Sequence, residues 1–358
     1  MSRELLKNVS RIVVKLGTGV LTDSKKKPDL QQMKQLVTQM AMQRKAGREV
    51  VLVTSGAVGS GMGVLGFDKR PSDLAAMQAC AAVGQSRLMA TYDSLFAEFG
   101  LHVAQVLLTH DDLEHHERHL NARNTLVTLL KHGVVPIINE NDAISFTELK
   151  FGDNDKLSAL VACLMPADLL VILTTVDGVI ADFGKDSANM LSVVDQIDER
   201  VEKMAGGTTS ATAVGGMSSK IQAAKIVVRS GVPLVIASGR KTDVLKDILE
   251  GKEEGTLFIP KQERLSGRKR WIAFFHHPKG TLIVDDGAKA ALRENKKSLL
   301  PPGIVRCEGH FAAGDVIRIC DGDGTEFARG ISYFTSDALK TKDLPRTEVV
   351  DRDNLVII

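Results

Sequence analysis

Residues 136–160 read P-I-I-N-E-N-D-A-I-S-F-T-E-L-K-F-G-D-N-D-K-L-S-A-L. The apolar run at 134–138 predicts a buried strand, which leads into two clusters of carboxylate and amide side chains at 139–142 and 152–155. Apolar spacing resumes at Leu157 and predicts a helix. One such cluster would suit an Asx turn or a helix N-cap. Two clusters after a buried strand favour a ligand site, because ligands of open α/β sheets lie at the carboxyl ends of strands.

Strands and helices are predicted to alternate on both sides of this stretch. Strands are expected at 11–16, 49–53, 102–108, 134–138, 169–174 and 233–237, and helices at 29–46, 71–99, 112–131, 218–230 and 243–250. This alternation predicts an α/β fold in which a mainly parallel central sheet is covered by helices on both faces.

The pattern changes after residue 260. The polar run at 261–270 reads K-Q-E-R-L-S-G-R-K-R and predicts a linker, whose bounds we set at 261–267. Short strand-like pieces follow at 271–275, 280–284, 303–307, 316–320, 327–333 and 355–358. We therefore expect one larger domain over residues 1–260 and a small β-rich domain over residues 268–358.

The composition is that of an ordinary globular protein, with 358 residues, 44% hydrophobic and 25% charged, and a net charge of +2. Disordered and fibrous classes are therefore excluded, and the near-neutral charge argues against nucleic-acid binding through charge alone. The cysteines lack C-x-x-C spacing and no secretory signal begins the chain, so a reducing cytoplasm is expected. No apolar run approaches the about 20 residues needed to cross a bilayer.

Three glycine-bearing segments have features suited to anions: K-L-G-T-G at 15–19, S-G-A at 55–57 and G-G-M-S-S-K at 215–220. Glycine lets backbone N–H groups converge on phosphate oxygens, and a following helix N-terminus adds partial positive charge. None of the three is a Walker A loop, because G-x-x-x-x-G-K-[ST] does not occur in the chain.

Two lysines next to these glycines suit phosphoryl transfer. Lys15 is expected where a strand ends and Lys220 near the start of a helix. A single lysine in such a place is as readily a solvated surface charge. Together with Asp153 and Asp155, however, the pair suits phosphoryl transfer, whose transition state spreads negative charge that fixed cations and Mg²⁺ stabilise. If the acceptor is a carboxylate, no general base is required.

Other local patterns are interpreted as structural. The G-x-G-x-x-G letters at 61–66 begin well after the preceding strand ends, and no acidic residue stands at the expected place, so a dinucleotide site is disfavoured. His115, His116 and His119 lie in a densely charged segment that favours a solvated helix face over a metal site. Ser55 has no His or Asp partner nearby in the sequence, which argues against a nucleophilic role.

Several motifs, taken in order and spacing, carry a family resemblance. They are V-V-K-L-G-T (13–18), V-T-S-G-A-V (53–58), A-V-G-Q-S-R-L (82–88), L-N-A-R-N-T-L (120–126), V-P-I-I-N-E-N-D (135–142), F-G-D-N-D-K-L-S-A-L (151–160) and G-G-M-S-S-K (215–220). Residues 11–258 resemble the glutamate 5-kinases of the amino acid kinase family, and residues 268–344 resemble the PUA domain that follows the kinase domain in many members.

The resemblance implies ATP-dependent phosphorylation of the L-glutamate side-chain carboxylate to γ-glutamyl phosphate, the first step of proline synthesis, with feedback inhibition by proline. Carried over by position, Ser55, Asp142 and Asn154 would hold glutamate. Lys15 and Lys220 would stabilise the transferring phosphoryl group, and Asp155 would orient the two lysines. The residues that would contact ATP are Lys15, Thr174, Thr175, Val214, Gly215, Gly216, Met217, Ser218, Ser219 and Lys220.

The same resemblance implies further partners. Mg²⁺ would arrive mainly on the ATP phosphates, so no protein ligand for a metal is assigned. A dimer or tetramer is expected, and the γ-glutamyl phosphate reductase is a candidate partner.

Two departures from the family pattern lie in the expected nucleotide region. The family commonly has Thr-Asp where this chain has Thr174-Thr175, and Gly-Thr-Ser where it has Gly17-Thr18-Gly19. We expect ATP use to be retained with altered affinity or base preference. The rival interpretations are another carboxylate or carbamate kinase of the same fold, an RNA-binding protein acting through the C-terminal domain, and, third, a dehydrogenase.

Overall fold

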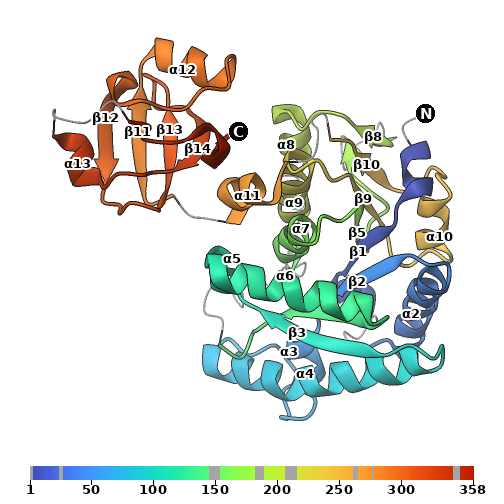
Figure 1. Cartoon of the computed structure of the whole chain (residues 1–358). Helices are drawn as coiled ribbons and strands as arrows, with labels where there is room; N and C mark the ends of the chain where they lie inside the picture. Colours follow the sequence, from blue (N-terminus) through green and yellow to red (C-terminus); the bar gives the residue numbers. More distant parts are fainter. Residues whose placement is uncertain are drawn as a thin grey trace. The chain divides into compact units, whose positions relative to one another are not determined.

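Runs of Val, Ile and Leu form the strands of the larger of two units, residues 1–264 and 265–358 (Figure 1). The computed structural model describes residues 3–23, 27–144, 154–181, 189–205, 216–260, 265–275, 278–341 and 347–358. The strands of the large sheet are β1 (Arg11–Leu16), β2 (Glu49–Val53), β3 (Val103–Leu108), β4 (Val135–Glu140), β5 (Leu169–Thr174), β8 (Val193–Val194), β9 (Leu234–Ser238) and β10 (Thr256–Phe258). A separate small sheet pairs β6 (Ile180–Ala181) with β7 (Asn189–Met190).

The described strands of the large sheet follow the order β3-β4-β2-β1-β5-β9-β10-β8. Neighbours from β3 to β9 run parallel, whereas β10 runs antiparallel to β9. The mainly parallel sheet predicted from the sequence is therefore confirmed. Strands β2, β3 and β4 lie on one side of β1, whereas β5 and β9 lie on its other side. The strand order therefore changes direction at β1, and the carboxyl ends of β1, β2, β4 and β5 meet there. This is the usual ligand position in open α/β sheets.

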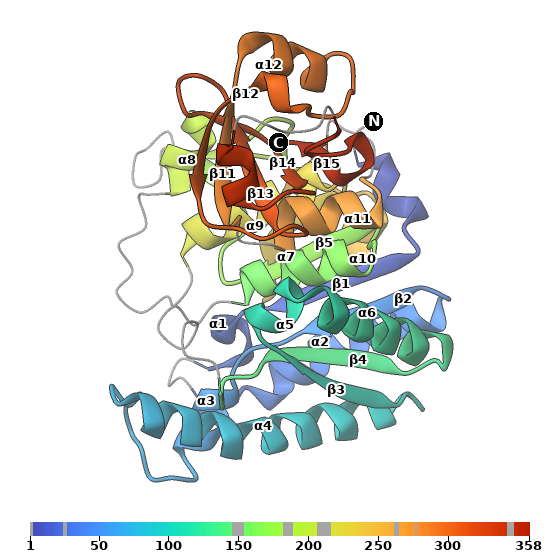
Figure 2. The ribbon, with the colours of Figure 1, turned by 60° about the vertical axis from the view of Figure 1, so that its left-hand side comes forward.

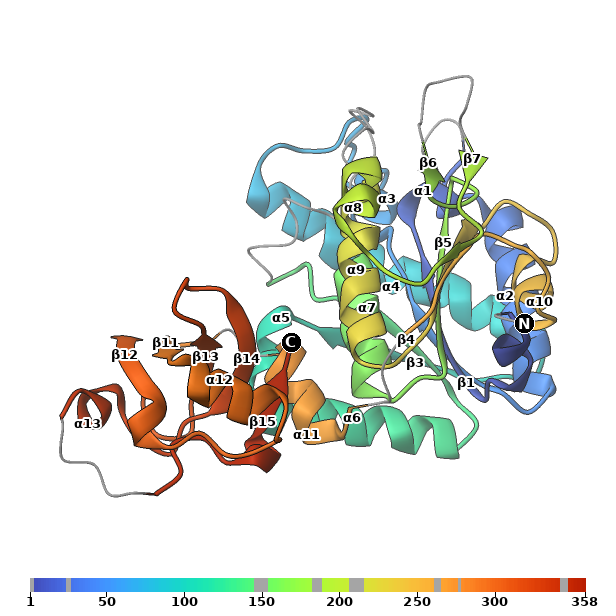
Figure 3. The same cartoon turned by 90° about the horizontal axis from the view of Figure 1, so that it is seen from above.

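Helices cover both faces of this sheet. They are α1 (Thr18–Leu21), α2 (Leu30–Lys45), α3 (Ala57–Met62), α4 (Leu74–Ala97), α5 (His110–Glu114), α6 (His116–Lys131), α7 (Asp155–Leu164), α8 (Glu199–Ala205), α9 (Met217–Arg229) and α10 (Val244–Leu249), preceded by a 3-10 turn, η1 (Glu4–Asn8). The main core lies between the strands and α2, α4 and α10, while α6, α7 and α9 contact the sheet from its other face (Figure 3). Figure 2 shows α4 and α6 on opposite sides of β3 and β4.

The helices α3 and α4 approach each other more closely than side chains at their contact would allow. A Cβ atom on Gly84 would lie 1.8 Å from the backbone oxygen of Ala57, and one on Gly61 would lie 1.9 Å from that of Cys80. Glycine at both positions therefore lets the two helix backbones touch. Because α3 begins shortly after β2 ends, this contact places α4 beside the carboxyl end of β2.

The smaller unit has its own sheet and core. Its elements are α11 (Gly267–Arg270), η2 (Trp271–Phe275), β11 (Gly280–Val284), α12 (Asp286–Arg293), the 3-10 turn η3 (Pro301–Gly303), β12 (Ile304–Gly309), β13 (Val316–Cys320), β14 (Glu326–Ile331), α13 (Ser336–Lys340), the 3-10 turn η4 (Arg352–Asn354) and β15 (Leu355–Ile357). The described strands follow the order β12-β11-β13-β14-β15 and enclose Leu282, Ile319 and Phe327 in a buried apolar cluster. The predicted β-rich C-terminal fold is confirmed.

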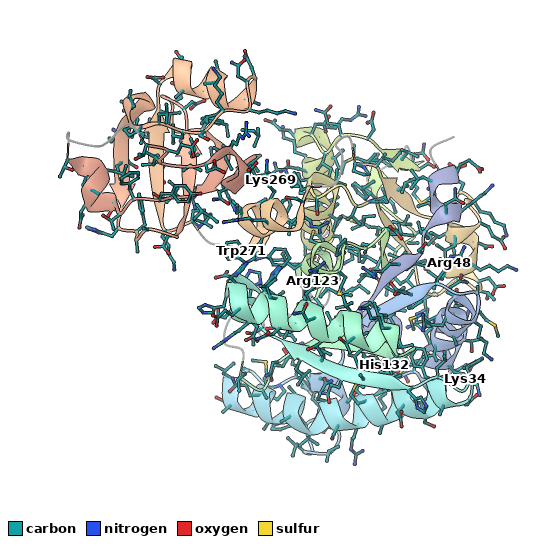
Figure 4. The ribbon with its side chains drawn as sticks, in the orientation of Figure 1. Lys34, Arg48, Arg123, His132, Lys269 and Trp271 are labelled. Carbon is teal, nitrogen blue, oxygen red and sulfur yellow. The ribbon has the colours of Figure 1, made fainter. Side chains whose placement is uncertain are left out.

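Two sequence-based predictions of elements are wrong. Residues 271–275, expected as a strand, form the π-helical turn η2 directly after α11, in which Trp271 (labelled in Figure 4) is buried. An apolar, aromatic run of this length fits a strand and a buried helical turn equally well. Residues 267–270, the end of the polar run, form α11, and residues 261–264 of the expected linker lie outside the described part of the chain. The helix predicted at 112–131 is divided at His115, whose backbone is extended, into α5 and α6.

Among the described residues, no helix combines the length and the apolar character that a bilayer span requires. The four cysteines at 80, 163, 307 and 320 are free thiols.

We expect Gly84→Ala to lower the free energy of unfolding by about 2 kcal/mol, because the added methyl group forces apart two backbones that are in contact. Thermal or urea unfolding followed by circular dichroism measures the effect. Gly59→Ala is the matched control, since a Cβ atom there meets nothing within 4 Å and alanine favours the helix. Equal stability of the Gly84 and Gly59 variants would contradict the close contact.

Candidate active site

One carboxylate and two ammonium groups form a buried cluster at the carboxyl edge of the large sheet. Lys15 extends from β1, Asp155 begins α7, and Lys220 lies in the first turn of α9. The Lys15 Nζ atom is 2.5 Å from Asp155 Oδ1, and the Lys220 Nζ atom is 2.9 Å from Asp155 Oδ2. The exposed fractions of the three residues are 3%, 0% and 6%. The structure thus brings together all three residues predicted to be catalytic.

The cluster keeps Asp155 ionised. Burial raises the pKa of its carboxyl group, but the ammonium groups of Lys15 and Lys220 outweigh burial and hold the pKa well below its usual range. Asp155 therefore stays charged at every pH near neutrality. With two ammonium groups and one carboxylate, the cluster carries one net positive charge, which attracts an anion.

The N-terminus of α9 lies against the same carboxylate. The Ser219 hydroxyl is 2.9 Å from Asp155 Oδ2 and 2.8 Å from the carbonyl oxygen of Gly216, the N-cap residue of α9. The first-turn N–H groups of a helix carry partial positive charge. Met217 and Ser218 begin this helix, so residues 217–220 of the predicted nucleotide segment 214–220 are helical and adjoin the cluster. Asp153, Val214 and Gly215 lie outside the described residues.

A group of buried amides lies on the other side of α7. The Asn154 Nδ2 atom donates to the backbone oxygen of Thr54 at 2.5 Å and to Asn139 Oδ1 at 2.7 Å, and it is 3.4 Å from the Ser55 hydroxyl. Ser55 follows β2, and Gly56 next to it has φ of 100°, a left-handed conformation that glycine adopts without strain. Ser55 and Asn154, which were both predicted to hold the substrate, therefore lie next to each other.

Three residues that were not among the predicted site residues complete this group: Asn139, Gln85 and Tyr92. Asn139 Nδ2 donates to Gln85 Oε1 at 2.8 Å, and the Tyr92 hydroxyl is 2.7 Å from the Thr54 hydroxyl. Burial raises the pKa of Tyr92, which remains a neutral hydroxyl. Asn139 belongs to the Asn/Asp cluster that follows the strand at 134–138, and Gln85 to the motif at 82–88. The sequence signals were therefore present, but no local pattern joins the two segments.

The remaining predicted substrate residue, Asp142, lies partly buried in the turn after β4. The strand β4 ends at the same sheet edge as β2, so Asp142 and Ser55 follow neighbouring strands.

Thr174 ends β5, and Thr175 follows it at the sheet edge. A Cβ atom built on Gly19 would lie 2.9 Å from Thr175 Cγ2. The two departures from the family pattern are therefore in contact with each other.

His115 and His116 are exposed, as predicted for a solvated helix face, but the third histidine of the segment is not. His119 is buried, with its ring Nδ1 3.3 Å from the backbone oxygen of Leu113. Within the described residues, no three His, Cys, Asp or Glu side chains are grouped to hold a metal ion. The arrangement suits binding of an anion beside the two lysines, next to a group of buried amides and hydroxyls.

The chain matches two family models. The amino acid kinase family model matches residues 10–238, and the PUA domain model matches residues 280–352. A glutamate 5-kinase from Geobacter sulfurreducens is 46% identical over 374 residues and aligns along 100% of both chains. One from Moorella thermoacetica is 44% identical over 371 residues, covering 99% of this chain and 98% of its own.

A solved structure supports the fold assignment. The carbamate kinase from Giardia lamblia bound to AMP-PNP superposes with a TM-score of 0.52 at 18% identity, over 71% of this chain and 100% of its own. The chain therefore belongs to the amino acid kinase family, in which it groups with the glutamate 5-kinases, and it carries a C-terminal PUA domain.

Proposed function

We propose that this protein transfers the γ-phosphoryl group of ATP to the side-chain carboxylate of L-glutamate, giving γ-glutamyl phosphate and ADP in the first step of proline synthesis. The observation that carries the proposal is Asp155, held between the Lys15 and Lys220 ammonium groups beside a wall of amides. The full-length similarity to glutamate 5-kinases supports the same reaction.

The two lysines serve the transferring phosphoryl group. Negative charge spreads over its three equatorial oxygens in the transition state, and preorganised cations in a dry site stabilise that charge. Asp155 fixes the Nζ atoms of both lysines through charge-assisted hydrogen bonds and keeps them from moving as the charge develops. The acceptor carboxylate is already ionised at neutral pH, so the step needs no general base.

The amide side serves the amino acid. Asn154 and Ser55 lie together at the end of β2, and Asp142 follows the neighbouring strand β4. The Asp142 carboxylate is a suitable partner for the substrate ammonium group. The side-chain carboxylate of glutamate would then extend toward Lys15 and Lys220.

The nucleotide side is formed by the N-terminus of α9 and the end of β5. The ATP phosphates would lie at residues 216–220, with Thr174 and Thr175 beside the nucleotide. Mg²⁺ would accompany ATP on its phosphates. Inhibition by proline, assembly into dimers or tetramers, and binding of the reductase or of RNA stay predictions.

The decisive experiment measures ADP release with Mg-ATP and hydroxylamine, which traps acyl phosphates as hydroxamates. Glutamate, aspartate, N-acetylglutamate and carbamate are compared as acceptors. Hydroxamate from glutamate alone is expected. Turnover of another acceptor in preference to glutamate would replace the proposal with a related carboxylate or carbamate kinase.

Asp155→Asn should lower kcat by roughly two to three orders of magnitude, because the lysines lose the charge that orients them. It should also destabilise the fold by about 3 kcal/mol, since two buried ammonium groups are left facing a neutral amide. Steady-state kinetics and thermal unfolding measure the two effects. Asp247→Asn, which breaks the surface pair of Asp247 with Lys252, is the control and should change neither. An unchanged kcat in Asp155→Asn would remove Asp155 from the mechanism.

Gly19→Ala should raise the KM for ATP about fivefold, equivalent to about 1 kcal/mol of overpacking against Thr175. Thr175→Ser deletes the Cγ2 atom in question, so the double variant should regain the native KM. Kinetics with ATP and GTP measure both affinity and base preference. Gly63→Ala, where a Cβ atom meets nothing within 4 Å, is the matched control. Equal effects of Gly19→Ala with and without Thr175→Ser would show that the two positions act separately.

A further inference from the structure

We propose that Gln85, on α4, is a positioning residue for the amino-acid substrate: it holds the Asn139 amide in the orientation that aligns Asn154. This inference rests on the proposed function, because it assigns Gln85 to the substrate side of that site. Gln85 itself would touch neither the substrate nor the transferring group.

The buried amides form a directional series from α4 to α7. Gln85 Oε1 accepts from Asn139 Nδ2 at 2.8 Å, which leaves Asn139 Oδ1 to accept from Asn154 Nδ2 at 2.7 Å and from the Glu140 backbone N–H at 3.0 Å. A side-chain amide has two N–H donors on nitrogen and one acceptor oxygen, so each end of Asn139 has a defined role. A reversed Asn139 would present its NH₂ group to the NH₂ group of Asn154.

The orientation of Asn154 determines what it offers a ligand. Its Nδ2 atom donates to Asn139 Oδ1 and to the Thr54 backbone oxygen, which uses both of its hydrogens. The side chain can therefore present only its oxygen to a substrate, as an acceptor for a donor such as an ammonium group. Loss of the Gln85 contact would remove one of the two constraints on the Asn139 amide and leave only the Glu140 backbone N–H to hold its oxygen in place.

The close packing at Gly84, the residue before Gln85, places Gln85 at this position. Gly84 touches the backbone of α3, where a Cβ atom would meet the Ala57 oxygen at 1.8 Å, and so draws α4 against the end of β2. Gln85 and Tyr92 lie on one buried face of α4, seven positions apart. Tyr92 reaches the Thr54 hydroxyl at 2.7 Å, so α4 contacts the substrate side at two points.

The energetics of Gln85 point away from a purely structural role. Its side chain is 8% exposed, and its Nε2 atom has no hydrogen-bond partner within the described part of the chain. A buried donor without a partner costs free energy. Leucine at this position would remove that cost, and this gain offsets the loss of the acceptor for Asn139 Nδ2. The useful atom of this glutamine is therefore its acceptor oxygen, which orients Asn139.

Gln85→Leu should raise the KM for glutamate roughly tenfold while leaving the KM for ATP and the thermal midpoint near their native values. If Gln85 had a purely structural role, the substitution would instead lower the thermal midpoint and leave both KM values unchanged. The control is Gln43→Leu, which removes another buried acceptor: Gln43 Oε1 accepts from Arg48 at 2.8 Å (Arg48 is labelled in Figure 4). Arg48 precedes β2, at the opposite end of the strand from the site, so glutamate KM should not change.

A double-mutant cycle tests whether Gln85 acts through Asn139. Asn139→Ala alone should raise the glutamate KM, and Gln85→Leu added to it should have no further effect. Full additivity of the two changes would overturn the proposed route. An unchanged glutamate KM in Gln85→Leu alone would overturn the positioning role itself.

Two further comparisons distinguish failure of the proposed function from failure of the positioning role of Gln85. If the native protein turns over a different acceptor, the same variants are compared with that acceptor. Crystal structures of the native and Gln85→Leu proteins without ligand need no substrate at all. Displacement or reversal of the Asn139 and Asn154 side chains is expected, and an Asn154 that keeps its Thr54 and Asn139 contacts would overturn the inference.

Discussion

The buried ion cluster of Asp155 with Lys15 and Lys220 is the constraint on which the larger unit depends. A buried carboxylate is tolerated only when opposite charges and hydrogen bonds compensate its desolvation. The three groups come from β1, α7 and α9, so the strand and both helices must keep their relative positions. The parallel pairing of β1 with β5 and the packing of α7 against α9 provide that rigidity.

The beginning of α7 links the two sides of the site. Asn154 forms hydrogen bonds with residues at the ends of β2 and β4, whereas the next residue, Asp155, binds the lysines of β1 and α9. The groups proposed to hold the substrate and those proposed to stabilise the phosphoryl group are thus held by consecutive residues of one chain segment. A displacement of α7 would disturb both together, which suits a reaction in which acceptor and phosphoryl group must be aligned within fractions of an ångström.

The region proposed for the nucleotide shows how the residue at one position constrains the residue at another. Gly19 leaves room for the Thr175 methyl group, and Arg240 secures the same segment by donating to the Gly19 backbone oxygen at 2.9 Å and to Asp29 Oδ2 at 3.0 Å. The segment between β1 and α2 is therefore held against the ends of β5 and β9. The two departures from the family pattern, at positions 19 and 175, are therefore coupled through the space that the Thr175 methyl group occupies.

The sequence by itself determined the alternation of strands and helices, the mainly parallel sheet and the β-rich C-terminal region, because side-chain periodicity is a local property. It also pointed to Lys15, Asp155 and Lys220 as members of one site, since each stands next to a glycine or Asn/Asp motif, and the structure brings these three residues together. It could not distinguish a strand from a π-helical turn at 271–275, where composition permits both.

Only the tertiary structure decided which of these segments meet. Gln85 is 54 positions from Asn139, and Asn154 is 100 from Thr54, so no local pattern connects them. Their hydrogen bonds depend on the contact between α3 and α4 and on the order of strands in the sheet. Such contacts are properties of packing between distant segments, and no periodicity within any one segment records them.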